Sequence, residues 1–185
     1  NRSLVLSPDG SRIAYDALDE TGDVWITQIE GGPHSRLTFE GSQNTGIAWR
    51  GNGTITFTSY RGDHSAVYAR RVDGTGTADS VLRLEAPIWD GTWSPDGAWF
   101  VFRTGETLNA RDMWAIRPGV HSVPRPLLQS GFDELFPQVS PDGRWLSYSS
   151  NESGVHEVFV RPFPEVESGR VQVSTAGGRM ARWSR

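Results

Sequence analysis

The sequence predicts an all-β fold of the β-propeller type, and three observations support that prediction. The tetrapeptide Ser-Pro-Asp-Gly occurs three times and a degenerate copy lies between the first two, so that the copies begin at Ser7, Arg50, Ser94 and Ser140. Each full copy is followed eight residues later by one aromatic residue, and ten to twelve residues after that by a second. The chain therefore repeats about every 45 residues, in short hydrophobic runs that Gly and Pro interrupt. Other arrays of that period are helical, so this pattern indicates propeller blades.

Each repeat is expected to form a meander of four antiparallel strands. The first repeat places them at residues 4–6, 13–15, 24–26 and 36–38, and the third at residues 91–93, 99–102, 113–116 and 125–128. The Asp-Gly pair of each motif predicts a two-residue type I′ hairpin between the first two strands, because Asp and Gly tolerate the positive φ angles of that turn. The expected blade units are residues 1–40, 41–85, 86–130 and 131–175, with residues 176–185 starting a fifth.

The repeated aromatic residues are expected to pack in the core of the blades. By this interpretation, replacement of Trp25 or Trp114 with alanine lowers the stability of the fold by several kcal/mol, about the cost of truncating a large core side chain.

These units form one array over residues 1–185, which we interpret as part of a larger propeller. A propeller closes by pairing its terminal strands, and an open array leaves sheet edges uncovered. Two alternatives remain. One is a closed ring of four blades with a spare strand, and the other is self-association of chains through open blade edges.

The composition is that of an all-β domain with a sizeable core. Hydrophobic residues make up 36% of the 185 residues, and there are eight Trp and eight Phe. The absence of cysteine excludes disulfides. All 18 basic residues are arginine, and the net charge of −4, without clustered basic residues, argues against nucleic acid as a partner. No apolar run is long enough for membrane insertion by this segment.

Catalytic and metal-binding motifs are not found in the sequence. It contains no Gly-x-Ser-x-Gly, no His-Glu-x-x-His and no Cys/His spacing of a metal site. The acidic residues at the entry to the third strands, Asp23, Asp112 and Glu157, recur because the blade recurs. The sequence therefore predicts no catalytic residue, no metal and no cofactor.

Acidic residues gather in one class of predicted loops. The loops between second and third strands and those between blades share one rim, where acids outnumber arginines, while the Ser-Pro-Asp-Gly turns lie on the other. Such a polarised ring favours a cationic peptide or protein segment. Aromatic residues beside the acids suit an Arg- or Lys-bearing segment, through apolar contact, cation–π interaction and ion pairing. The predicted binding residues of this rim are Glu85, Trp89, Asp90, Phe132, Asp133 and Glu134. The alternative is a solvated charged face.

The repeats resemble a family of bacterial WD40-like propellers, the PD40 repeats typified by the TolB C-terminal domain. Trp93 to Gly97 followed by Phe100 to Phe102 is similar to the family's first hairpin, and Gly22 to Ile26 is similar to its third strand. The resemblance covers the whole chain. At the C-terminal end, Val158 to Pro164 and Arg182 to Ser184 are similar to the propellers attached to bacterial eukaryotic-like Ser/Thr kinases.

The resemblance implies a function but does not fix it, because one fold carries many functions. It implies a non-catalytic protein- or peptide-binding propeller, an extracytoplasmic (periplasmic or cell-surface) sensor or scaffold module of a receptor kinase or of a TolB-like envelope protein. The alternative is the substrate-gating propeller of a prolyl-oligopeptidase-like serine hydrolase, whose catalytic domain is absent from this sequence. A polysaccharide-processing propeller enzyme is a third hypothesis.

Overall fold

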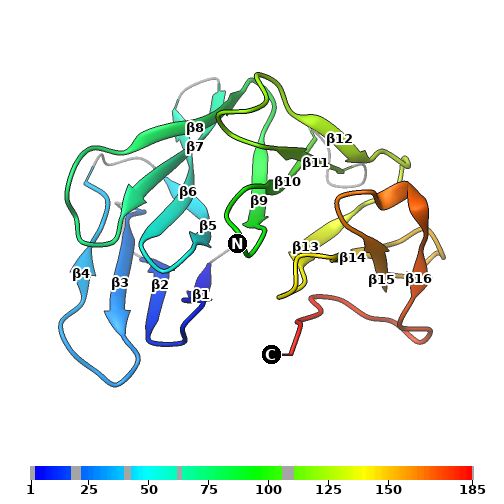
Figure 1. The fold of residues 1–185 in the computed structure, drawn as a ribbon, viewed down its shortest axis with the longest axis horizontal. Helices are drawn as coiled ribbons and strands as arrows, with labels where there is room; N and C mark the ends of the chain where they lie inside the picture. Colours follow the sequence, from blue (N-terminus) through cyan, green and yellow to red (C-terminus); the bar gives the residue numbers. More distant parts are fainter. Residues whose placement is uncertain (1–2, 18–21, 40–42, 62–63, 106–110, 185) are drawn as a thin grey trace. The chain divides into compact units, whose positions relative to one another are not determined.

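A computed structural model describes residues 3–17, 22–39, 43–61, 64–105 and 111–184 of the chain. Within these ranges the structure is built from β-strands, together with one short 3-10 turn, η1 (Val166–Ser168). The strands form four sheets of four antiparallel strands each (Figure 1). The predicted all-β fold with four-stranded blades is therefore confirmed. The predicted boundary between the first two blades falls at residues 40 and 41, which lie outside the described residues.

The chain divides into two compact units, residues 1–90 and residues 91–185. In the first unit, one sheet has the order β1-β2-β3-β4 and the next has the order β5-β6-β7-β8. The strands of the first sheet are β1 (Leu4–Leu6), β2 (Arg12–Asp16), β3 (Val24–Gln28) and β4 (Ser35–Arg36). Those of the second are β5 (Asn44–Arg50), β6 (Thr54–Arg61), β7 (His64–Arg71) and β8 (Asp79–Leu84). That all of residues 1–185 form one array remains a prediction.

The third and fourth sheets repeat this order. The third consists of β9 (Ile88–Trp93), β10 (Phe100–Thr104), β11 (Asp112–Ile116) and β12 (Arg125–Leu128). The fourth consists of β13 (Leu135–Val139), β14 (Trp145–Ser150), β15 (Glu157–Pro162) and β16 (Val171–Gln172), and η1 precedes its last strand.

The Ser-Pro-Asp-Gly motif joins the first two strands of a sheet, as predicted, but through a different turn. In all three copies the Gly N–H donates to the Ser carbonyl, at 2.8–2.9 Å, so that Pro and Asp are the central residues. The Gly has positive φ (67–75°), but the Asp does not. The type I′ prediction was therefore wrong, because Pro at the second position sets the negative φ of a four-residue turn.

Side chains of the motif lock this turn in the same way each time. In the first copy the Ser7 hydroxyl donates to Asp9 Oδ1 at 2.6 Å and accepts the Arg12 N–H at 2.9 Å. Asp9 Oδ1 also accepts the Ser11 N–H at 2.9 Å. These hydrogen bonds lower the pKa of Asp9 and, in the third copy, of Asp142 to about 2. Hydrogen bonding within the turn therefore accounts for the recurring Asp.

The two repeated aromatic residues of each blade face each other across the second and third strands. The paired positions are Tyr15 with Trp25, Phe57 with Tyr68, Phe102 with Trp114, and Tyr148 with Phe159. In two blades the rings stack, with centroids 6.1 Å apart for Phe57 and Tyr68 and 5.7 Å apart for Tyr148 and Phe159. Cross-strand aromatic pairs stabilise a sheet directly, so the spacing in the sequence reflects strand register.

The core of each unit lies between its two sheets. In the first unit, Ala14, Val24 and Ile26 pack with Ile47, Ile55 and Phe57. In the second, Val101, Met113 and Leu127 pack with Leu146, Tyr148 and Phe159. Trp25 and Trp114 are only partly buried, whereas Phe57 and Phe102 are completely inaccessible to solvent. We therefore expect truncation of these phenylalanines to lower the free energy of unfolding more than truncation of the two tryptophans.

Residues 179–184 form no strand, in contrast to the predicted first strand of a fifth blade, because no neighbouring strand of the described residues pairs with them. Trp183 nevertheless keeps the contact of an innermost strand. Its Nε1–H donates to the Gln138 carbonyl of β13 at 3.1 Å, just as Trp49 Nε1–H of β5 donates to the Val5 carbonyl of β1 at 3.1 Å. Trp183 therefore makes the same hydrogen bond to the preceding sheet as Trp49, although the segment around it forms no strand.

Candidate functional site

The antiparallel order of each sheet determines which connections lie at the same end of that sheet. In a four-stranded meander, the connection from the second to the third strand lies at the same end as the connection to the next blade. The predicted binding residues all lie at that end of their sheets, at or just before an innermost strand. Glu85, Trp89 and Asp90 belong to the first compact unit, and Phe132, Asp133 and Glu134 belong to the second.

The residues of the first unit lie in the connection from β8 to β9 and in the start of β9. Glu85 is exposed in that connection, while Trp89 and Asp90 are half-buried within the strand itself. The strand is held from β6, where the Tyr60 hydroxyl donates to the Ile88 carbonyl at 2.7 Å. Burial, followed by the nearby Asp90 carboxylate, raises the pKa of Tyr60.

A glycine in β5 allows that strand to lie close to the start of β9. Gly46 has a φ of 57°, and a Cβ at this position would lie 3.0 Å from Thr58 Oγ1 and 3.4 Å from the Trp89 carbonyl oxygen. Only glycine adopts that conformation without strain in so little space. Gly46 therefore positions the backbone of Trp89, a role that the sequence analysis missed.

The residues of the second unit precede β13 and differ sharply in exposure. The side chain of Phe132 is 40% exposed, whereas Asp133 is 7% exposed and Glu134 only 2%. Their backbone is held on both sides, because the Asp133 N–H donates to Asn151 Oδ1 at 2.9 Å and the Glu134 N–H donates to the Arg111 carbonyl at 3.1 Å. The aromatic ring is therefore presented to solvent by a fixed acidic segment.

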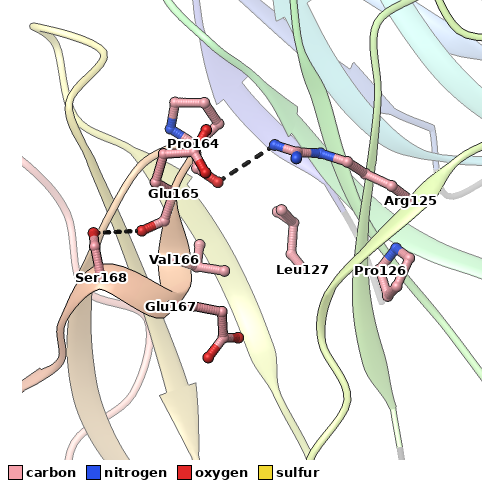
Figure 2. Close-up of a pocket in the computed structure, with 8 residues that line it drawn as sticks. All are labelled: Arg125, Pro126, Leu127, Pro164, Glu165, Val166, Glu167 and Ser168. Carbon is pink, nitrogen blue, oxygen red and sulfur yellow. Dashed lines mark hydrogen bonds between the residues drawn. The ribbon is translucent and has the colours of Figure 1, made fainter.

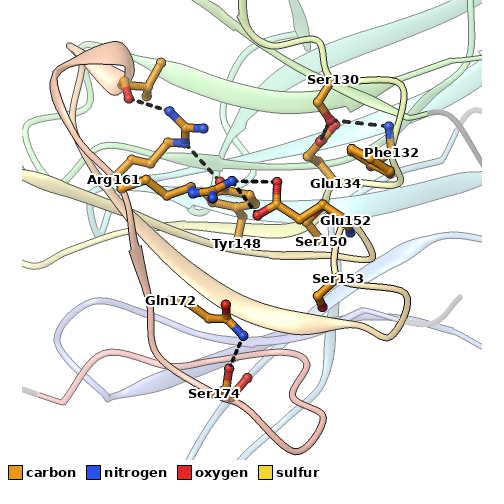
Figure 3. Close-up of polar contacts among 12 residues, drawn as sticks. Ser130, Phe132, Glu134, Tyr148, Ser150, Glu152, Ser153, Arg161, Gln172 and Ser174 are labelled. Carbon is orange, nitrogen blue, oxygen red and sulfur yellow. Dashed lines mark hydrogen bonds and ion pairs between the residues drawn. The ribbon is translucent and has the colours of Figure 1, made fainter.

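The two carboxylates have different surroundings. Asp133 Oδ1 lies 3.8 Å from Arg111 Nε, so the aspartate has a cationic neighbour. Glu134 Oε1 accepts a hydrogen bond from the Ser130 hydroxyl, while Glu134 Oε2 has no hydrogen-bond partner among the described residues (Figure 3). Burial, reinforced by the charges of Asp112, Asp133 and Glu152, raises the pKa of Glu134 to about 7. Glu134 is therefore only partly ionised near neutral pH.

We expect Glu134→Gln to raise the free energy of unfolding at pH 8 by about 1–2 kcal/mol, because glutamine occupies the same buried position without the charge. The pKa of Glu134 is raised from 4.5 to about 7, so this group favours the folded state most at low pH. Its contribution falls as the pH rises from 4.5 to 7 and stays low above 7. Glutamine stays neutral and removes this dependence.

Urea unfolding of both proteins at pH 5 and pH 8 measures the effect. The pKa of His156 is lowered by burial and by Arg179, and both proteins contain this group, so the difference between the two proteins is the relevant quantity. An equal change of stability with pH in both proteins would show that Glu134 is not held in this way.

Arg103, at the end of β10, is buried although it carries a charge. Its side chain is among the largest fully buried ones, and its guanidinium lies 5.3 Å from the centre of the Phe136 ring. Phe136 itself has a φ of 55°, which is unusual for a residue with a side chain. No pattern in the sequence signals this contact, because Arg103 and Phe136 lie on different sheets.

The acids at the entry to the third strands have the structural role that the sequence predicted. Asp23 accepts hydrogen bonds from Thr38 and Arg36, and the Thr38 hydroxyl accepts the Val24 N–H at 2.9 Å. In the fourth sheet Ser174 repeats this arrangement, since it donates to Glu157 and accepts the Val158 N–H at 2.8 Å. A Ser or Thr hydroxyl just after the fourth strand thus ties the chain there to the third strand in both blades.

In the described part of the chain, no group of three or more His, Cys, Asp or Glu side chains is arranged to hold a metal ion. Nor does any helix there have the length and apolar character needed to cross a membrane.

Comparison with known proteins gives relatives of low sequence identity. No protein-family model matches the chain. An uncharacterized protein of Agrobacterium fabrum is 25% identical over 85% of the chain, and the uncharacterized peptidase YuxL of Bacillus subtilis is 24% identical over 83%. The chain spans about half of the first relative (53%) and less than a third of the second (31%).

Solved structures agree on the fold. A protein described as TolB from Agrobacterium tumefaciens matches 90% of this chain with a TM-score of 0.76 and 20% identity, and the match covers 62% of that protein. TolB from Acinetobacter baumannii matches 93% of the chain with a TM-score of 0.72 and 16% identity, over 43% of its own length. A prolyl endopeptidase matches 95% of the chain with a TM-score of 0.65 and 14% identity, over 29% of its length. The chain thus has a β-propeller fold similar to that of TolB proteins.

Proposed function

We propose that this chain is a non-catalytic propeller module that binds a cationic peptide or protein segment at its acidic and aromatic rim. The observation that carries the proposal is the segment before β13, where a partly exposed Phe132 stands next to two buried carboxylates. An aromatic anchor beside acidic groups suits an Arg- or Lys-bearing partner, because apolar contact, cation–π interaction and ion pairing act together. Glu85, Trp89 and Asp90 supply the same residue types at the corresponding end of the third sheet.

The resemblance to PD40 propellers and the similarity to TolB structures support a sensor or scaffold role outside the cytoplasm. We infer that the parent protein is a receptor kinase or a TolB-like envelope protein. In either case the propeller supplies recognition and carries no catalytic residue of its own.

Binding of a fluorescein-labelled peptide tests the proposal. The probe alternates arginine with leucine, and a second peptide of equal length carries citrulline in place of arginine. We expect the arginine peptide to bind more tightly, and both Phe132→Ala and the double variant Glu85→Gln/Asp90→Asn to weaken its binding by about 1 kcal/mol or more, which is roughly fivefold.

The matched control is Glu30→Gln/Asp79→Asn, which removes two exposed acids away from this rim. Fluorescence anisotropy in low and high salt gives the affinities, and added salt should weaken the arginine peptide selectively. Equal affinities for the rim variants and the control variant would contradict the proposal.

A second candidate is the substrate-gating propeller of a prolyl-oligopeptidase-like hydrolase. It is favoured by the similarity to the uncharacterized peptidase YuxL and to a prolyl endopeptidase structure. Assay of the complete gene product against proline-containing peptides separates the two candidates. Cleavage that a serine-directed inhibitor abolishes would establish the hydrolase.

A further inference from the structure

A groove in the second unit lies between β12 of the third sheet and the turn that follows β15 in the fourth. It has a volume of about 460 Å³ and is lined by residues 125–127 and 164–168 (Figure 2). None of these residues belongs to the acidic rim. β12 is an edge strand of its sheet.

The floor of the groove is apolar. Leu127 and Val166 are each only 5% exposed and belong to the same hydrophobic cluster, which anchors both walls in the core. Pro126 and Pro164 flank them. A floor of this kind suits a hydrocarbon chain such as the methylene stem of a long side chain.

The one cation that lines the groove is already engaged. The guanidinium of Arg125 lies 4.6 Å from the centre of the Trp99 ring, and Arg125 Nη2 donates to the Pro164 carbonyl at 3.4 Å (Figure 2). The guanidinium group of Arg125 therefore already has two partners, the Trp99 ring and the Pro164 carbonyl.

The two anions of the groove are not engaged. Glu165 and Glu167 are exposed, and within the described ranges neither carboxylate takes part in a hydrogen bond or an ion pair. The turn that carries them is rigidly tied. The Ser168 N–H and hydroxyl donate to the Glu165 carbonyl at 3.0 and 2.6 Å, and Arg161 Nη1 donates to the Val166 carbonyl at 2.9 Å. Two carboxylates are thus held beside an apolar floor with no counter-charge of their own.

We propose that this groove binds one arginine or lysine side chain of a partner protein, at a site separate from the acidic rim. The stem lies along Leu127 and Val166, and the charged end pairs with Glu165 and Glu167. Charge complementarity favours a cationic side chain, because Arg125 already contacts Trp99 and Pro164 while the carboxylates of Glu165 and Glu167 have no partner among the described residues. A turn that is fixed before binding lowers the entropic cost of holding the ligand.

Titration of the isotope-labelled protein with N-acetyl-arginine amide, followed by NMR, tests the site directly. We expect saturable shifts of the backbone amides in residues 125–128 and 165–168. N-acetyl-citrulline amide, which has the same stem without the charge, should bind about fivefold more weakly or worse. Guanidinium ion, which has the charge without the stem, should also bind more weakly than the arginine amide.

The double variant Glu165→Gln/Glu167→Gln should weaken binding of the arginine amide at the groove about fivefold, whereas Glu30→Gln/Asp79→Asn should leave it unchanged. Both glutamates are exposed, so we expect these changes to preserve the fold. Equal affinities of the arginine and citrulline amides at residues 125–128 and 165–168, an absence of saturable shifts at these residues, or full affinity in the groove variant would each overturn the proposal. The backbone amides of these residues report on the groove alone, so failure of the groove is distinguishable from failure of the rim.

Discussion

Replacement of Phe102 with alanine is expected to lower the free energy of unfolding by about 3–5 kcal/mol. Phe102 is completely buried in β10, its ring stacks on Phe100 with centroids 5.7 Å apart, and it faces Trp114 across the sheet. Alanine would remove these contacts and leave a cavity, because the surrounding strands are fixed by their hydrogen-bond register.

Urea unfolding followed by tryptophan fluorescence measures this loss. Phe132→Ala is the matched control, since the same truncation at a ring that is 40% exposed should cost about 1 kcal/mol or less. Similar losses for the two variants would show that β10 is not a core strand.

Gly91→Ala is expected to destabilise the protein by about 1–3 kcal/mol or more, although it adds a single methyl group. An added Cβ would lie 2.4 Å from Phe100 Cζ and 2.8 Å from the Val101 carbonyl oxygen. Phe100 is 1% exposed and stacks on Phe102, so neither the ring nor the strand can move aside without repacking the core.

The control for this variant is Gly53→Ala, because nothing lies within 4 Å of a Cβ at that position. Thermal melts of the two variants should separate clearly, with Gly53→Ala close to the wild-type protein. A wild-type melting temperature for Gly91→Ala would mean that β9 and β10 do not approach as closely as the structure shows.

Strand positions were predictable from the sequence because the same spacing of turn motif and aromatic residues recurs in each repeat. The aromatic residues that recur at fixed spacing proved to be cross-strand pairs, as for Phe57 with Tyr68. Turn type was not predictable from Asp-Gly alone. The preceding Pro sets the φ angle of its position, and the Ser hydroxyl then locks a four-residue turn, as in the hydrogen bond from Ser7 to Asp9.

The candidate rim was predictable in its residue types and in the end of the sheet at which they lie. The burial of the acidic residues was not predictable. Asp133 and Glu134 stand beside Phe132 in a polar loop, and nothing local distinguishes a buried carboxylate from an exposed one. Their environment depends on Arg111 and Asn151, which only the fold brings near.

The fold class, the four-stranded repeat and the pairs of aromatic residues follow from the sequence alone, because strand period and turn chemistry are local properties that repetition reinforces. Which acids are buried, which arginines are engaged by neighbouring groups and which carboxylates have no partner among the described residues depends on the three-dimensional packing. Arg103 lies buried against Phe136, Arg125 is engaged by Trp99 and Pro164, and Glu167 has no partner among the described residues. Desolvation and pairing depend on distances between residues of different strands and sheets, and those distances are set by packing.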